Sequence, residues 1–115
     1  MKKLLTVAVA AMTLAGTVNA QTAGNAKAAE PKVAMCIGCH AIPGYRISYP
    51  EIYTVPLLGG QNAAYIVSAL QAYKKGERKH PTMRGIAGTL TDQDMADIAE
   101  YYAAQTSATT INKLK

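Results

Sequence analysis

The sequence contains no Phe and no Trp, so its seven Tyr are its only aromatic residues. A chain of 115 residues is bounded to one small domain. Because Tyr is more polar than Phe, such a domain has few large apolar side chains with which to build a core. The composition therefore indicates that the fold is completed by something other than amino acids.

Long apolar runs are also lacking. A transmembrane helix needs about 20 apolar residues, whereas the apolar run at residues 4–15 has 12 positions. Two lysines precede this run, and small residues suited to cleavage follow it at 18–20. This order of parts predicts a signal peptide over residues 1–20, cut before Gln21. We therefore expect an exported, periplasmic protein with no membrane anchor.

A concentrated charge of one sign is absent as well. Residues 21–115 hold 10 basic and 7 acidic side chains, so the formal charge falls from +5 for the full chain to +3. Nucleic-acid binders gather Lys and Arg into a dense stripe beside a recognisable reading motif. This sequence has neither, which excludes a nucleic-acid partner.

Cysteine is scarce, since Cys36 and Cys39 are the only two, and His40 follows them directly. In an exported chain a disulfide is the first interpretation, but cysteines three apart would close a very small loop and add little stability. A thioredoxin-like redox pair needs a strand-rich pattern, which is missing around Cys36. A structural zinc site needs more ligands, and the only other histidine is His80.

The same three residues suit the attachment of a cofactor. From Pro31, a favoured first-turn residue, apolar residues recur at helical spacing. Positions i, i+3 and i+4 share one face of a helix, so Cys36, Cys39 and His40 would project from one edge. Cys-x-x-Cys-His is the attachment signature of c-type haem, in which both cysteines bond to the porphyrin and the histidine ligates iron. The sequence thus predicts one haem c, bound covalently through Cys36 and Cys39.

The rest of the chain predicts an all-α domain of three main helices with long loops around the haem. The first helix carries the attachment motif. A second helix is expected from an N-cap at Asn62 to about Gly76. A third is expected from an N-cap at Thr91 to about Gln105.

Proline and glycine divide the remaining segments. Residues 41–60 hold three prolines and three glycines, and residues 77–90 are broken by Pro81, Gly85 and Gly88, so both segments are expected to be irregular. The expected organisation is a flexible N-terminal lead-in at 21–30, a domain at 31–105 and a polar C-terminal tail at 106–115.

This order of parts resembles a class I c-type cytochrome of the small, single-haem bacterial kind. The resemblance covers residues 30–105. Its features are the motif at 36–40, the Pro-Leu-Leu-Gly-Gly-Gln stretch at 56–61, Tyr65, Tyr73, Gly76, Arg78, Met83, and Leu-Thr-Asp-Gln-Asp at 90–94 before a helix that ends in Tyr101 and Tyr102. The resemblance implies an all-helical fold around one covalent haem, with His40 and Met83 as axial iron ligands, that works as a one-electron carrier.

The distal iron ligand can also be weighed from the residues themselves. Met35 adjoins the attachment motif and cannot reach around a haem, and Met95 falls in an apolar stripe where a core role explains it. Met83 lies in the irregular segment, where the backbone can turn to present it inward. His80 competes as a ligand, although a surface position in the charged run at 74–80 is the simpler interpretation.

The ligand pair decides the chemistry. A thioether is a soft, neutral donor that favours Fe(II), so His/Met ligation raises the reduction potential, and a six-coordinate iron has no vacant place for a substrate. We therefore expect an electron carrier rather than an enzyme, either a monomer or a weak dimer. Its partners would be redox proteins such as a terminal oxidase, a quinol-oxidising complex or a dehydrogenase. The alternative is a small peroxidase, or a bis-His haem protein with His80 at the distal side.

Supporting roles are expected of three further sets of residues. A carbonyl should accept a hydrogen bond from the second ring nitrogen of His40, and among Pro43, Pro50 and Pro56 we favour Pro50. Arg46, Tyr49 and Tyr53 are candidates for contact with the haem propionates. Lys74, Lys75, Arg78 and Lys79 are candidates for steering a partner, although basic residues also suit a solvated helix end.

Overall fold

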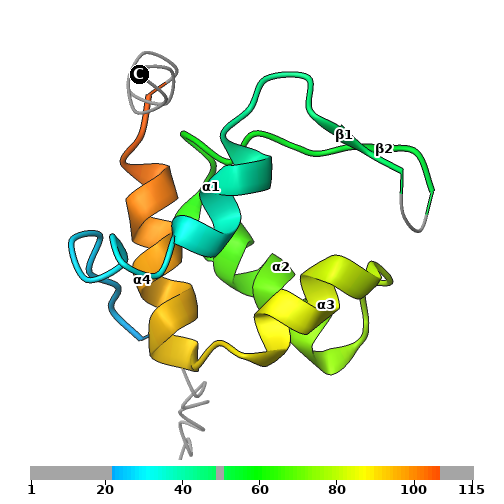
Figure 1. The fold of residues 1–115 in the computed structure, drawn as a ribbon. Helices are drawn as coiled ribbons and strands as arrows, with labels where there is room; N and C mark the ends of the chain where they lie inside the picture. The colour runs from blue at the N-terminus through cyan, green and yellow to red at the C-terminus, as the bar shows by residue number, and fades with distance from the viewer. Residues whose placement is uncertain (1–21, 49–50, 107–115) are drawn as a thin grey trace, which may run out of the picture.

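The computed structural model describes residues 22–48 and 51–106. The expected signal peptide and nearly all of the polar tail lie outside these residues, as do Tyr49 and Pro50. The described chain contains four helices and one short hairpin: α1 (Ala34–His40), β1 (Arg46–Ile47), β2 (Tyr53–Thr54), α2 (Ala63–Lys75), α3 (Pro81–Gly88) and α4 (Asp92–Ala103) (Figure 1). The all-α prediction is confirmed, with one helix more than expected. None of the helices in these two ranges is long and apolar enough to cross a membrane.

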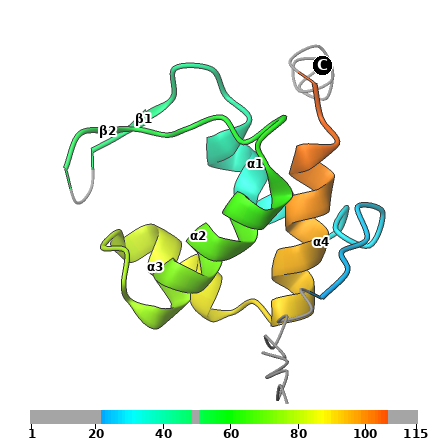
Figure 2. The same cartoon turned by 180° about the vertical axis from the view of Figure 1, so that it is seen from behind.

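The helix α2 begins and ends where the sequence predicts. Asn62 is extended, and its side chain accepts a hydrogen bond from the Tyr65 N–H at 3.1 Å. Gly76 ends the helix in the left-handed conformation (φ 82°), which glycine adopts without steric cost. Seen from behind, α2 lies between α3 and α4, and it packs against both (Figure 2).

The helix α4 starts with a full capping box. Oγ1 of Thr91 accepts the Asp94 N–H at 3.1 Å, and the Asp94 carboxylate accepts the Thr91 N–H at 2.9 Å. The inner face of α4 carries Met95, Ile98 and Tyr102, which are among the most buried large side chains. Met and Tyr therefore take core positions in a chain that has no Phe or Trp, and the core role predicted for Met95 is confirmed.

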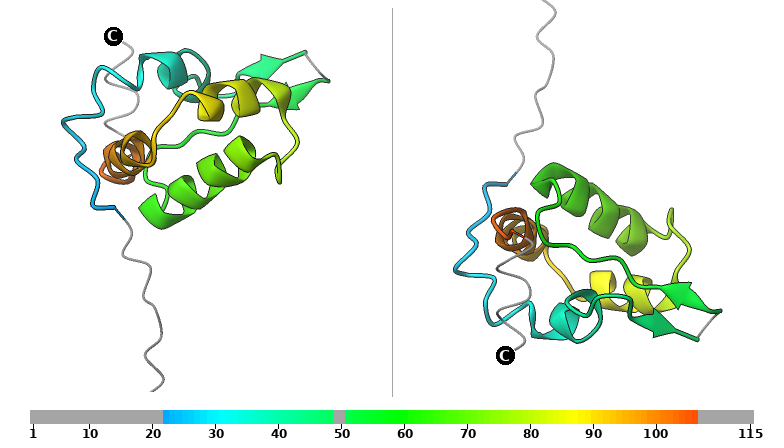
Figure 3. Two further views of the ribbon diagram at one scale, coloured as in Figure 1. Left: turned by 90° about the horizontal axis from the view of Figure 1, so that it is seen from below. Right: turned by 90° about the horizontal axis from the view of Figure 1, so that it is seen from above.

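The segment that precedes α1 runs along the outer side of α4 (Figure 3). Ala29 is fully buried, and the Asn25 N–H donates to Oδ1 of Asp97 at 2.8 Å. Nζ of Lys32 contacts the carboxylates of both Asp94 (2.7 Å) and Asp97 (2.8 Å). The described part of the lead-in expected at 21–30 is therefore held against α4 by the buried Ala29 and by the hydrogen bond from Asn25 to Asp97.

The prediction that residues 77–90 are irregular is wrong, because α3 occupies Pro81–Gly88. Pro81 stands in the first turn, where its missing N–H is not needed and its fixed φ favours the helix. Gly85 in the interior costs about 1 kcal/mol relative to Ala. Packing offsets this cost, since Ala87 is fully buried and Met83 lies against the core.

The long loop predicted at 41–60 contains a short antiparallel pairing. Arg46 lies opposite Thr54, and Ile47 lies opposite Tyr53. The Val55 N–H then donates to the Tyr45 carbonyl at 2.9 Å. This pairing turns the chain back, so that residues 55–58 return past α1 on their way to α2 (Figure 1).

Candidate cofactor site

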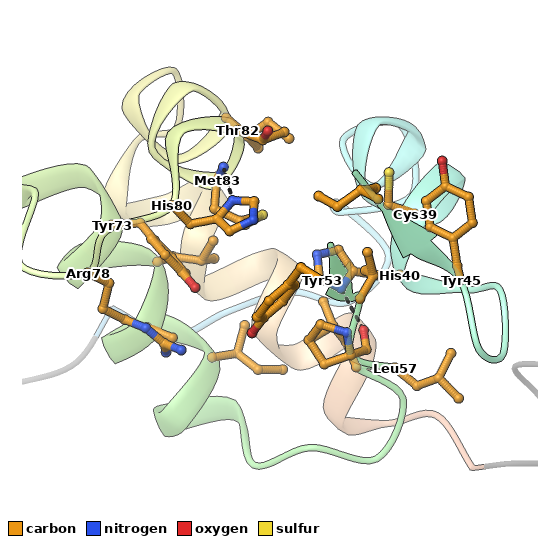
Figure 4. Close-up of a pocket in the computed structure, with 18 of the residues that line it drawn as sticks. Cys39, His40, Tyr45, Tyr53, Leu57, Tyr73, Arg78, His80, Thr82 and Met83 are labelled. Atoms are coloured by element: carbon orange, nitrogen blue, oxygen red, sulfur yellow. Dashed lines mark hydrogen bonds between the residues drawn. The ribbon is translucent and has the colours of Figure 1, made fainter. Parts of the chain in front are cut away.

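A cavity of about 550 Å³ lies between α1, the β1–β2 hairpin, the irregular segment 55–58 that follows it, α2 and α3. This volume is within the range of small-molecule and cofactor pockets. Its wall is largely apolar and includes Val55, Leu58, Ile66, Leu70 and Ile86. Figure 4 shows Cys39 and His40 on one side of the cavity, with His80 and Met83 on the other.

The attachment motif lies on α1, as predicted. Cys39 and His40 line the cavity, whereas Cys36 lies one helical turn earlier and is buried in the core cluster. Cys36 and Cys39 are not joined by a disulfide. Burial, reinforced by the neighbouring Cys39, raises the pKa of the Cys36 thiol to about 11, because an apolar surrounding disfavours the thiolate. Within residues 22–48 and 51–106, no group of three His, Cys, Asp or Glu side chains is arranged to hold a metal ion.

His40 is oriented by a backbone carbonyl. Its Nδ1 lies 2.7 Å from the carbonyl oxygen of Pro56, so Nδ1 carries the proton and donates it, and Nε2 keeps its lone pair. Burial lowers the pKa of His40, and this effect outweighs the hydrogen bond to Pro56, which raises the pKa. The net result favours the neutral imidazole. The preference for Pro50 is therefore wrong, because the turn made by the hairpin brings Pro56 to the ring.

The opposite wall is formed by α3. Met83 lies on its first turns and is partly buried against the core. His80 is the N-cap residue of this helix, and its Nδ1 accepts the Met83 N–H at 3.4 Å. The interpretation of His80 as a surface histidine is wrong, because its ring lines the cavity and its Nε2 is buried.

Polar residues near the edge of the cavity include some that the sequence analysis did not assign to the cofactor. Arg46 and Tyr53, two of the predicted propionate contacts, line it. Arg78 lies over the Tyr73 ring with 4.7 Å to the centroid, and its Nη1 is 3.5 Å from the Tyr65 hydroxyl. Tyr65 and Tyr73 are eight residues apart, about two helical turns, and this spacing is the signal that could have grouped them.

These residues fit a haem on chemical grounds. The site offers two thiols on one helix, an imidazole with a free lone pair, a thioether on the facing wall and basic side chains at the edge. Nε2 of His80 agrees with this fit. It is buried and has no hydrogen-bond partner in the part of the chain that the structure describes, as expected where a bound group supplies one.

Comparison with known proteins gives the family. The model described as Cytochrome c matches residues 26–104. The chain belongs to the cytochrome c family. Cytochrome c-554(548) of Halomonas halodenitrificans is 42% identical over 86 residues, which are 72% of this chain and 99% of that protein. Cytochrome c4 of Pseudomonas aeruginosa is 37% identical over 105 residues, which are 91% of this chain and 49% of that protein.

The fold agrees with a solved member of the family. The crystal structure of reduced recombinant cytochrome c4 from Pseudomonas stutzeri matches with a TM-score of 0.59 and 36% identity, and the match covers 73% of this chain and 47% of that chain. The cytochrome thus spans about half the length of the cytochromes c4 that it matches. The predicted class I cytochrome fold is confirmed. The cofactor of this family is covalently bound haem c, and the cytochrome is a c-type electron carrier.

Proposed function

We propose that this cytochrome carries single electrons between redox proteins through one haem c, attached at Cys36 and Cys39 and ligated by His40 and Met83. The observation that carries the proposal is the arrangement of donors across one cavity. His40 presents its free Nε2 from α1, and Met83 belongs to the facing wall on α3 (Figure 4). Haem c supplies one-electron chemistry at its iron, and the chain holds, shields and tunes it.

The chain's part on the proximal side follows from the Pro56 carbonyl. By accepting the Nδ1–H of His40, it fixes the ring orientation and makes Nε2 a stronger donor to iron. On the distal side a neutral thioether favours Fe(II), so we expect a high reduction potential for this ligand pair.

The other distal candidates are less well supported. Met95 is fully buried in the core, and Met35 lies on the helix that carries His40. Neither can face His40 across the cavity. His80 lines the cavity, but its Nδ1 is engaged at the start of α3. A peroxidase would need an open iron position beside an acid-base residue, and a bis-His protein would need His80 to leave its cap.

The surface supports a partner with an acidic docking face. Residues 74–84 hold five basic residues and one acidic residue, a net charge of +4, whereas the other described residues hold three basic and six acidic, a net charge of −3. We name Lys75, Arg78, Lys79 and Arg84 the basic cluster. Within the described residues both salt bridges are made by Lys32, so these four cations have no carboxylate partner there. Lys74, also expected to steer, instead donates to the Leu90 carbonyl.

Export to the periplasm is the remaining part of the proposal. It is supported by the basic start, apolar run and small-residue cleavage site within residues 1–20. The mass of the purified holoprotein tests export and cofactor content together. We expect the mass of residues 21–115 plus one haem. A mass without haem, from cells able to mature c-type cytochromes, would contradict the proposal.

The substitution Met83→Ala tests the ligand pair. Loss of the thioether should abolish the weak long-wavelength absorption band of ferric-thioether ligation and lower the reduction potential, because the soft donor that favours Fe(II) is gone. A redox-titrated absorption spectrum measures both quantities. Met95→Leu is the matched control, since it removes a core thioether and should change neither. Carbon monoxide should bind the reduced Met83→Ala protein but not the reduced native protein, and rapid binding to the native protein would favour the peroxidase alternative.

A further inference from the structure

His80 stands at the junction between the charged end of α2 and the cofactor cavity. It is the last residue before α3, with an extended backbone (φ −147°, ψ 108°). Its Nδ1 accepts the Met83 N–H at 3.4 Å, and its carbonyl accepts the Arg84 N–H at 2.9 Å. The side chain thus satisfies one of the N–H groups that the first turn of a helix leaves without an intrahelical partner. That N–H belongs to Met83.

This cap determines where the proton of a neutral imidazole lies. A ring nitrogen that accepts a hydrogen bond carries no proton, so the proton is on Nε2. In this tautomer Nε2 is a donor without a lone pair and cannot ligate iron. His80 therefore cannot cap α3 and bind iron at the same time.

Nε2 is itself buried in the cavity wall and has no hydrogen-bond partner in residues 22–48 and 51–106. The Tyr53 ring packs against the imidazole, with 5.4 Å between the ring centroids. A buried donor left without an acceptor destabilises a fold, and such donors are rare in folded proteins. An acceptor on the group that fills the cavity would satisfy this donor. The acceptors at the edge of a haem are its two propionate carboxylates.

We propose that His80 is a positioning residue of the haem site, which fixes the start of α3 at Met83 through Nδ1 and donates Nε2–H to a haem propionate. The inference rests on the proposed function, because it assumes that haem fills this cavity with Met83 as the distal ligand. It assigns to His80 a role that excludes iron ligation. One side chain would thus contact the backbone of the distal ligand through Nδ1 and the edge of the haem through Nε2.

Two substitutions in the holoprotein separate the two ring nitrogens. His80→Asn keeps a side-chain acceptor suited to an N-cap but lacks Nε2, whereas His80→Ala lacks both. We expect His80→Asn to keep the ferric-thioether band and His80→Ala to weaken it. Both should shift the propionate bending mode in the resonance Raman spectrum and lower the reduction potential, because a propionate that loses its donor stabilises the ferric state. Lys79→Ala, an exposed neighbour, should leave the thioether band and the propionate mode unchanged.

The contrary results are distinct. A propionate mode unchanged in both variants would overturn the hydrogen bond, and a thioether band lost equally in both would overturn the cap. A native spectrum of bis-imidazole ligation that both substitutions abolish would make His80 an iron ligand and overturn the inference entirely. Failure of the proposed function gives a different pattern, namely a native thioether band that survives Met83→Ala.

Discussion

At the scale of single residues, the two polar or charged residues of the described core are both hydrogen-bonded. In the described core the buried polar side chains are His40 and Asp97. His40 is hydrogen-bonded to Pro56, and Asp97 accepts from the Asn25 N–H, from Lys32 and from Gln93, each at 2.8 Å. Each buried group therefore fixes a segment remote in sequence, one at the cofactor and the other under the N-terminal segment.

Asp97 should make the stability of the holoprotein depend on pH. Its pKa lies below the ordinary value, first because Lys32 donates to the carboxylate and then because Asn25 and Gln93 do. A carboxylate whose pKa is lowered by folding stabilises the native state above its unfolded pKa of about 3.9, and this stabilisation is lost as pH falls through the folded pKa. We expect the Tm to fall as pH drops from about 5 towards 3, less steeply in Asp97→Asn than in the native protein.

Thermal unfolding followed across that pH range measures the difference. At pH 7 the Asp97→Asn protein should be less stable by roughly 1.5–3 kcal/mol, because hydrogen bonds to a charged acceptor are lost. Asp92→Asn makes the same change at an exposed position of the same helix and should retain the native slope. Parallel curves for the native and Asp97→Asn proteins would show that Asp97 contributes nothing to acid sensitivity.

The sequence predicted those site residues whose roles depend only on their neighbours along the chain. The spacing of Cys36, Cys39 and His40 is enough to predict a common helical face, and α1 provides it. The carbonyl partner of His40 depends on how a 20-residue loop returns, which the pairing of Arg46 with Thr54 decides. No local pattern distinguishes Pro56 from Pro50, and none shows that His80 turns inward.

At the scale of elements, short helices depend on their neighbours more than on their composition. The caps at Asn62 and Thr91 predicted α2 and α4 because each precedes a long apolar stripe. The helix α3 has eight residues, with Pro at its start and two glycines, so its pattern resembled a loop. It forms because the His80 side chain caps its first turn and because its apolar side packs against α2.

Glycine substitutions in two elements should have opposite effects on stability. A Cβ on Gly24 would overlap the Ala96 carbonyl, where the N-terminal segment approaches α4, so Gly24→Ala should destabilise the protein by about 1–3 kcal/mol. A Cβ on Gly85 meets nothing within 4 Å, so Gly85→Ala should stabilise α3 by up to about 1 kcal/mol. Denaturant unfolding of the two holoproteins checks both signs. A Gly24→Ala protein of native stability would show that the N-terminal segment is not held closely against α4.

At the scale of the whole molecule, the distribution of charge over the surface decides where a partner docks more than the net charge does. The α2–α3 corner is basic, whereas α4 carries Asp92, Asp94, Asp97 and Glu100. Arg78 and His80 line both the cofactor cavity and an adjoining surface hollow that also includes Lys79 and Arg84. An acidic partner drawn to the basic cluster would therefore arrive beside the α3 wall of the cofactor cavity.

Reversing one charge at two places tests this steering. Lys79→Glu, in the basic cluster, and Lys27→Glu, in the N-terminal segment, change the net charge equally at exposed positions. Oxidation of the reduced cytochrome by hexacyanoferrate(III), a compact anion, should be slowed roughly threefold or more by Lys79→Glu at low ionic strength, and much less by Lys27→Glu. Stopped-flow absorbance measures both rates. The difference should vanish near 1 M salt, where the Debye length is about 3 Å. Equal slowing by the two substitutions would mean that only net charge attracts the anion, and the basic cluster would then be a solvated helix end that neutralises the α2 dipole.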